Sequence, residues 1–246
     1  MRSLVLLAVA ALAGATRADE AVLRDGQRVQ GTLSLTADRR WQFLPTGKKE
    51  ALPLTSIHHV RFPDGNATPL QAELVQRVTL SDGTVLTGVV LSLDARQLEM
   101  RTAWAERIAV PRTSLTTIQA LARGDDPRRG AGDRAQDEIW LSDGDQVFGH
   151  LLDGDRRSVQ MKGAFGTRSF RWTDVRGLFL SGRKPKSQEG ERVKLWLDGG
   201  AGGEPDLLEG RIIAWDEKRC RLHHPDLGEL EVEQRRIRRL TWAAKE

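Results

Sequence analysis

The sequence is poor in the residues that build disulfide scaffolds, aromatic pockets and membrane spans. It contains one cysteine, Cys220, so no disulfide can form within the chain and stability must come from packing. Tyrosine is absent and aromatic residues make up 5% of the chain, which favours small polar-surfaced domains over one deep ligand pocket. No apolar run approaches the roughly 20 residues that a spanning helix needs, so we expect no transmembrane segment.

The first 18 residues have the pattern of a secretory signal peptide. Arg2 precedes an apolar run over residues 4–15, and small residues end at Ala18. Cleavage there would remove Arg2 and Arg17 from the 38 basic residues and none of the 34 acidic ones, which leaves 36 against 34 and a net charge of about +2. We therefore expect an extracytoplasmic protein, periplasmic or secreted, whose small net charge indicates no particular charged partner.

One pattern occurs four times in what remains. Each copy opens with a leucine shortly before Asp-Gly: LRDG at 23–26, LSDG at 80–83, LSDG at 141–144 and LDG at 197–199. A second glycine follows five residues after the first, or after the insert GAGGEP in the fourth copy: Gly31, Gly88, Gly149 and Gly210. An aspartate comes six residues later in three copies, at Asp94, Asp155 and Asp216, with Asp38 one place further on in the first copy. The shared register indicates an internal repeat.

Each part of the pattern has a structural meaning. Alternating apolar residues predict strands with one buried face, and Asp-Gly between two such runs predicts a tight hairpin whose glycine has a positive φ. The second glycine falls on the inward side of a long strand, where it permits a bend and a close approach of the next strand. A long bent second strand is how a short sheet curls into a barrel.

These signals predict an all-β fold of four tandem five-stranded barrels. After the signal peptide at 1–18, we expect the units at 19–65, 74–122, 135–182 and 190–243, joined by exposed linkers rich in glycine, proline and charge. Because one such unit buries too little surface alone, neighbouring units should pack together or share strands.

The pattern resembles the Sm-like or SH3-like small β-barrel, and residues 78–121 carry it best. The chain is also similar in style to secreted bacterial proteins with such repeats. The resemblance implies RNA binding and assembly through outer strands. In the family an aromatic residue or asparagine follows the conserved aspartate, whereas this chain has DARQ, DRRS, DEKR and ADRR. We therefore expect no RNA binding, while oligomerisation through barrel edges stays open.

Two sets of residues are candidate binding sites. A basic residue stands eight places after each second glycine: Arg39, Arg96, Arg157 and Lys218. This set, the basic tips, is either a row of cations for a polyanion such as an acidic polysaccharide or a set of solvated hairpin ends. Four tryptophans fall on outward or loop positions, where they either stack on sugar rings or cover a neighbouring unit. They are Trp104, Trp140, Trp196 and Trp215, of which Trp104 and Trp140 are the binding candidates.

No catalytic or metal-binding pattern is present in the sequence. It has no nucleophile elbow, phosphate loop or zinc-type histidine pair, and His58-His59 and His223-His224 would point to opposite faces of a strand. We expect no metal, no cofactor and no enzymatic activity. The sequence favours an exported binding or scaffolding protein with a protein or polysaccharide partner in the cell envelope. The alternatives are a cell-envelope hydrolase, or an accessory subunit of one, and a polyanion or nucleic-acid binder that acts through Sm-like barrels.

Overall fold

The structure is a computed structural model in which residues 18–63, 70, 72, 74–121, 135–181, 192–199 and 204–242 are described. The predicted signal peptide lies outside these residues, apart from Ala18. The described residues likewise stop short of the outermost residues of the predicted units, at 64–65, 122, 182, 190–191 and 243.

The chain is an all-β protein, as the sequence predicts. The strands fall into four groups along the chain. Group 1 contains β1 (Asp19–Leu23), β2 (Arg28–Leu35), β3 (Trp41–Pro45) and β4 (Ile57–Arg61). Group 2 contains β5 (Gln76–Leu80), β6 (Val85–Leu93), β7 (Gln97–Thr102), β8 (Ile108–Pro111) and β9 (Leu115–Ala120). Group 3 contains β10 (Asp137–Leu141), β11 (Gln146–Asp155), β12 (Ser158–Gly163), β13 (Gly166–Arg171) and β14 (Val175–Phe179). Group 4 contains β15 (Val193–Leu197), β16 (Asp206–Trp215), β17 (Arg219–His224), β18 (Gly228–Glu233) and β19 (Ile237–Trp242).

Helical structure in the described part of the chain is limited to short 3₁₀ turns. Three of them are described in full: η1 (Leu54–Ser56), η2 (Arg112–Ser114) and η4 (Gln234–Arg236). Each of these three turns comes directly before the last strand of its group. No helix among the described residues combines the length and the apolar character needed to cross a membrane.

The strands of each group pair in the same antiparallel order. The first strand lies between the second and the last, as β5 does between β6 and β9. The second strand continues to the third, and the third to the fourth, as β6–β7–β8 shows. Group 1 departs from the predicted five strands: a single bridge between Phe43 and Leu52 replaces the fourth.

The predicted hairpin turns are confirmed in groups 1 to 3. Their glycines have positive φ, with values of 88° at Gly26, 90° at Gly83 and 99° at Gly144. The preceding aspartate closes each turn, because its Oδ1 accepts a hydrogen bond from the backbone N–H two residues later. The close strand approach at the second glycine is confirmed in all four groups. A Cβ at Gly88 would collide with the backbone carbonyl of Arg101, and the other three glycines face a carbonyl in the same way.

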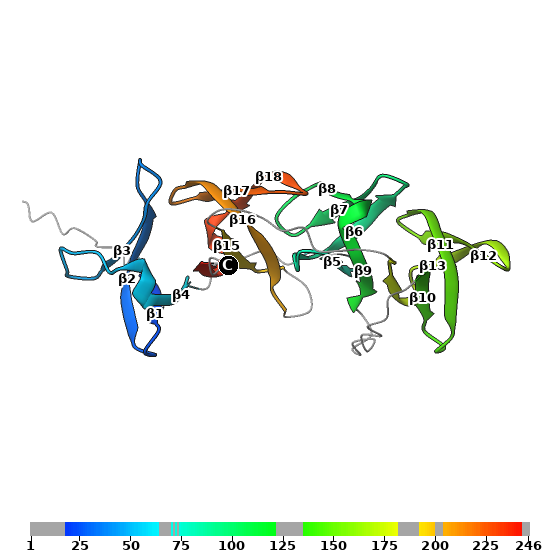
Figure 1. Cartoon of the computed structure of the whole chain (residues 1–246), viewed down its shortest axis with the longest axis horizontal. Helices are drawn as coiled ribbons and strands as arrows, with labels where there is room; N and C mark the ends of the chain where they lie inside the picture. Colours follow the sequence, from blue (N-terminus) through cyan, green and yellow to red (C-terminus); the bar gives the residue numbers. More distant parts are fainter. Residues whose placement is uncertain are drawn as a thin grey trace, which may run out of the picture.

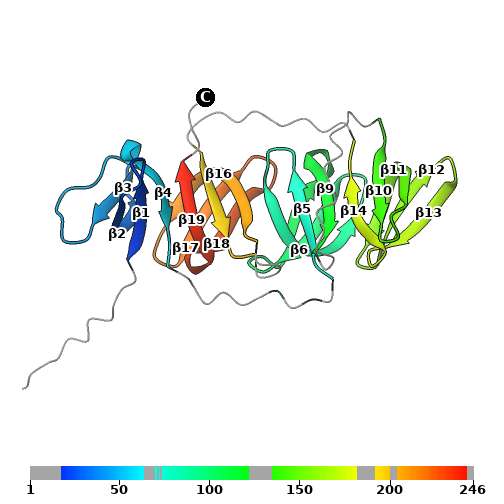
Figure 2. The same ribbon diagram turned by 90° about the horizontal axis from the view of Figure 1, so that it is seen from below.

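The groups are arranged in space in the order 1, 4, 2, 3, which differs from their order along the chain (Figures 1 and 2). Backbone pairing joins each group to the next: β4 to β19, β16 to β6, and β14 to β9. Groups 2 and 3 also share a short pairing of β6 with β11. The first and last groups of the chain are therefore neighbours, and group 4 lies between groups 1 and 2.

Equivalent positions meet at each junction. Val60 faces Leu240 between groups 1 and 4, and Ile118 faces Leu178 between groups 2 and 3. Each of these four residues is the fourth residue of the last strand of its group. At the centre, Leu207 faces Val85, and each stands three residues before the second glycine of its group. Each junction thus relates its two groups as an approximate two-fold axis would.

These junctions make one sheet continuous through twelve strands. Its order is β2–β1–β4–β19–β15–β16–β6–β5–β9–β14–β10–β11. One face covers the core, where Ala21, Val60, Leu240, Leu195 and Leu86 are buried. Because cross-strand partners point to the same side of a sheet, a single row of residues crosses the opposite face. The row runs Gln30, Glu20, Arg61, Arg239, Trp196, Leu207, Val85, Thr79, Thr117, Phe179, Glu138 and Phe148.

Candidate functional site

The basic tips lie at the ends of hairpins, where the backbone is held and the side chains are exposed. In group 2, Asp94 Oδ1 accepts hydrogen bonds from the N–H groups of Arg96 at 2.6 Å and Gln97 at 2.8 Å. Asp155 and Asp216 hold the turns of groups 3 and 4 in the same way. These N–H groups keep the pKa of each of the three carboxyls below its ordinary value. The recurring aspartate therefore has a structural role in the turn.

The first tip has a different geometry. Arg39 is the only non-glycine residue in the described part of the chain with a positive φ, at 60°. Its turn is closed by Thr36, whose hydroxyl donates to Asp38 and accepts from the backbone N–H of Arg40. No ion pair with a described residue involves the side chain of any basic tip. The four charges are thus available to a ligand, but no contact brings them together.

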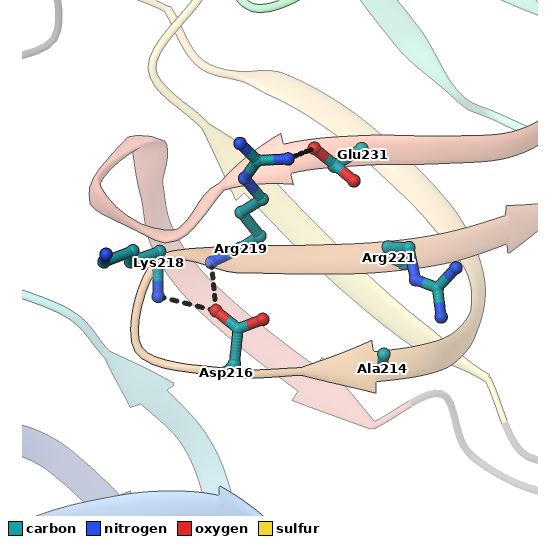
Figure 3. A pocket seen from close by; sticks show the side chains of 6 residues that line it. All are labelled: Ala214, Asp216, Lys218, Arg219, Arg221 and Glu231. Atoms are coloured by element: carbon teal, nitrogen blue, oxygen red, sulfur yellow. Dashed lines mark hydrogen bonds and ion pairs between the residues drawn. The ribbon is translucent and has the colours of Figure 1, made fainter.

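A hollow of about 470 Å³ lies at the tip of group 4. It is lined by Ala214, Asp216, Lys218, Arg219, Arg221 and Glu231. Figure 3 shows Arg219 paired with Glu231 on the neighbouring strand, and Asp216 bound to the backbone of the turn. Lys218 is therefore a basic tip that borders a concave surface. The carboxylates of this hollow already have partners and do not converge on a common point, so the arrangement offers no acid–base pair for catalysis.

Trp104 packs against a neighbouring group. Its indole N–H donates to Oδ2 of Asp206 at 2.9 Å, across the junction of groups 2 and 4. Asp206 is fully buried, and burial raises the pKa of its carboxyl to about 6. Trp215 also crosses a junction: its ring lies 5.4 Å from that of Trp41 and 5.5 Å from that of Phe62 in group 1. These two tryptophans cover a neighbouring unit, which is one of the two roles that the sequence left open.

Trp140 and Trp196 stay within their own groups. Trp140 donates its indole N–H to Glu138 and packs beside Phe179, with ring centroids 5.8 Å apart. The guanidinium of Arg239 packs over the ring of Trp196, 3.7 Å from the ring centroid. Both tryptophans are half-buried and lie on the outer face of the continuous sheet.

A buried polar cluster between groups 2 and 4 gave no signal in the sequence, because its members are 140 residues apart. His224 Nε2 lies 2.9 Å from the hydroxyl of Thr84 and 3.0 Å from Oδ2 of Asp82. Its Nδ1 accepts hydrogen bonds from the backbone N–H groups of Asp226 and Leu227. A catalytic triad needs the nucleophile and the carboxylate at opposite ring nitrogens, whereas both lie at Nε2 here. The imidazole is also fully buried, so the cluster ties two groups together.

Neither the thiol nor the metal-ligating side chains form a reactive centre. Cys220 is buried, and burial raises the pKa of its thiol to about 12. Across the described ranges, no three His, Cys, Asp or Glu side chains gather closely enough to hold a metal ion. No family model matches the chain, and no curated protein is similar to it.

Proposed function

We propose that the chain is an exported, non-catalytic protein that binds or scaffolds a protein or polysaccharide of the cell envelope. The observation that carries the proposal is the continuous sheet, which joins all four strand groups into one long outer face. A long face with repeated units suits multivalent contact, in which weak individual contacts add through effective concentration. The distinctive polar side chains, at Asp82, Thr84, His224 and Asp206, hold the array together and form no reaction centre.

We further propose that each strand group is a small barrel of the Sm-like or SH3-like kind. The long second strands of groups 2 to 4 support this, because each of the three changes its pairing register two residues after the second glycine. The changes follow Val90 in β6, Leu151 in β11 and Ile212 in β16. Such bulges bend a strand and increase its twist, which is what closing a short sheet requires. The resemblance to secreted bacterial proteins with such repeats supports export, together with the N-terminal apolar run.

The proposal is tested by comparing binding and turnover on the same envelope polymers. Purified protein is incubated with insoluble cell-wall polysaccharide, the bound fraction is measured after pelleting, and the chain length of the polymer is followed over time. We expect binding with unchanged chain length. Shortening of the polymer that disappears in an Asp216→Asn variant would instead establish a hydrolase. Export is tested separately: the N-terminal sequence of the protein from the extracytoplasmic fraction should begin at Asp19.

A further inference from the structure

Two arginines face each other where groups 1 and 4 meet. Arg61 on β4 is the register partner of Arg239 on β19. Directly opposite side chains in an antiparallel pair have Cβ atoms about 4.5–5.5 Å apart, and like charges at that distance destabilise the pair. Figure 2 shows the two strands side by side. The junction therefore places two arginines at opposite positions on the outer face of the sheet, where the guanidinium of Arg239 contacts Trp196 on β15 and that of Arg61 lies near Glu20 on β1.

The pairing of the strands does not require these charges. The junction of groups 2 and 3 uses the same register, and there the corresponding residues are Gln119 and Gly177. That junction forms with no charge at either position. The arginine pair thus adds an electrostatic cost at one junction only, which points to a role other than holding the strands together.

Arg239 is held in place without a counter-ion. Its guanidinium lies over Trp196, 3.7 Å from the ring centroid. Its Nε is buried and has no hydrogen-bond partner among the described residues, and no described carboxylate lies within ion-pair distance. Burial and the charge of Arg61 lower the pKa of the guanidinium. The stacking fixes the orientation of the side chain and leaves its charge uncompensated.

The positive charge of Arg61 is only partly compensated by neighbouring groups. Its Nε donates to Nε2 of His59 at 3.2 Å, and its Nη1 lies 3.8 Å from Glu20. Glu20 is at the same distance from Arg28, so one carboxylate serves two arginines. Burial, followed by the charge of Arg61, lowers the pKa of His59 to about 4, which leaves this histidine neutral at pH 7. The three arginines and Glu20 together carry a net charge of about +2, and half of the Arg61 side chain is exposed to solvent.

We propose that Arg61 and Arg239 form a binding site for a doubly charged oxyanion, either inorganic phosphate or a phosphate group carried by a polymer. A dianion matches the excess charge of the cluster, and arginine forks bind tetrahedral oxyanions through paired N–H donors. The ligand would accept from the free donors of both guanidiniums and remove the repulsion between them. Trp196 would keep Arg239 oriented while the ligand binds.

The test is a titration with inorganic phosphate, followed by NMR of the arginine Nε–Hε groups and the Trp196 indole. Saturable shifts are expected at Arg61, Arg239 and Trp196. Arg61→Gln and Arg239→Gln should each weaken binding about tenfold or more, because each removes charge-assisted hydrogen bonds. The control is Arg235→Gln, which makes the same change of charge at an arginine already paired with Glu233 at 2.9 Å. It should bind phosphate like the unmodified protein.

If Arg239→Gln does not fold, Arg61→Gln decides the question, because its side chain is half-exposed. The proposed site would be refuted if phosphate caused no saturable shifts. It would also be refuted if the arginine variants showed the same shifts as the Arg235→Gln control. A polymer that carries phosphomonoester groups, tested at equal phosphate concentration, distinguishes the two sources. Tighter binding that is lost in the variants assigns a polymer-borne phosphate, and binding of inorganic phosphate alone assigns the free ion. Binding at this site does not depend on export, so its failure would leave the proposed function standing.

Discussion

Replacing Asp206 by asparagine should stabilise the protein at neutral pH. Asp206 lies at the junction of groups 2 and 4, fully buried, with its Oδ2 bound to the indole of Trp104. The effect of burial on this carboxyl outweighs that of its hydrogen bonds with Trp104 and Thr87. An ionised carboxylate in this position lacks the solvation that it has in the unfolded chain. Asparagine keeps an acceptor for Trp104 and cannot ionise.

The size and sign of the effect follow from the pKa. Burial raises the pKa of Asp206 from 3.8 to about 6, which corresponds to about 3 kcal/mol at about 1.4 kcal/mol per pKa unit. Below pH 4 the carboxyl is protonated in both states and carries no penalty. Between pH 4 and 6 only the folded state holds the proton, so stability falls as pH rises, and above pH 6 the full penalty applies. Asp206→Asn should therefore be stabilising by up to about 3 kcal/mol at pH 8 and near neutral at pH 4.

The assay is urea unfolding of both proteins at pH 4, 5, 6, 7 and 8. The difference in free energy of unfolding should rise through pH 4–6 and then level off. Asp216→Asn provides the control with opposite sign, because hydrogen bonds from the backbone lower the pKa of Asp216. The stability that Asp216 contributes is present at neutral pH and lost as pH falls. A difference between Asp206→Asn and the unmodified protein that does not vary with pH would refute the reasoning.

Four further predictions follow from the contacts described. Gly88→Ala should lower the free energy of unfolding by about 2 kcal/mol or more, because its Cβ meets a backbone carbonyl. Gly83→Ala should lower it by about 1 kcal/mol, because only the positive φ opposes a side chain there. Urea unfolding that ranks the two variants in the reverse order would contradict this. His224→Leu should cost about 2 kcal/mol in the same assay, since it leaves two backbone N–H groups without an acceptor. Cys220 should resist iodoacetamide at pH 8 until urea unfolds the protein, and rapid labelling of the native state would show that it is accessible. Changing all four basic tips to glutamine should leave the melting temperature nearly unchanged. Binding of an acidic polysaccharide should weaken in this variant, and it should also weaken as the salt concentration rises. If neither change affects binding, the tips are solvated turns with no binding role.

Local features of the fold could be predicted from the sequence because they depend on neighbouring residues. The Asp-Gly turn needs a positive φ at its second residue, and Gly26, Gly83 and Gly144 supply it. The inward glycine follows from the two-residue period of a strand, and Gly88 does lie against the backbone of the next strand. The missing fourth strand of group 1 had no clear signal in the sequence, because Pro53 precedes its 3₁₀ turn just as Pro111 does in group 2, where β8 forms.

The candidate sites were less predictable, since their chemistry depends on distant partners. The sequence marked the four basic tips because they recur at one spacing. It also marked Trp104 as an outward residue, but the residue that it covers, Asp206, lies in another strand group. The pair Arg61 and Arg239 carried no signal, because nothing in either stretch of sequence indicates that the two strands meet.

The sequence alone determined which residues form hairpins and which face of each strand is buried, since turn conformation and side-chain alternation are set within a few residues. Only the tertiary structure decided that group 4 lies between groups 1 and 2. A strand edge can pair with any strand of suitable direction and register, so the choice of partner depends on side chains that meet only after folding. At the central junction the partner is determined by the contacts of Val85 with Leu207 and of Thr84 with His224. No pattern in either segment could have predicted these contacts.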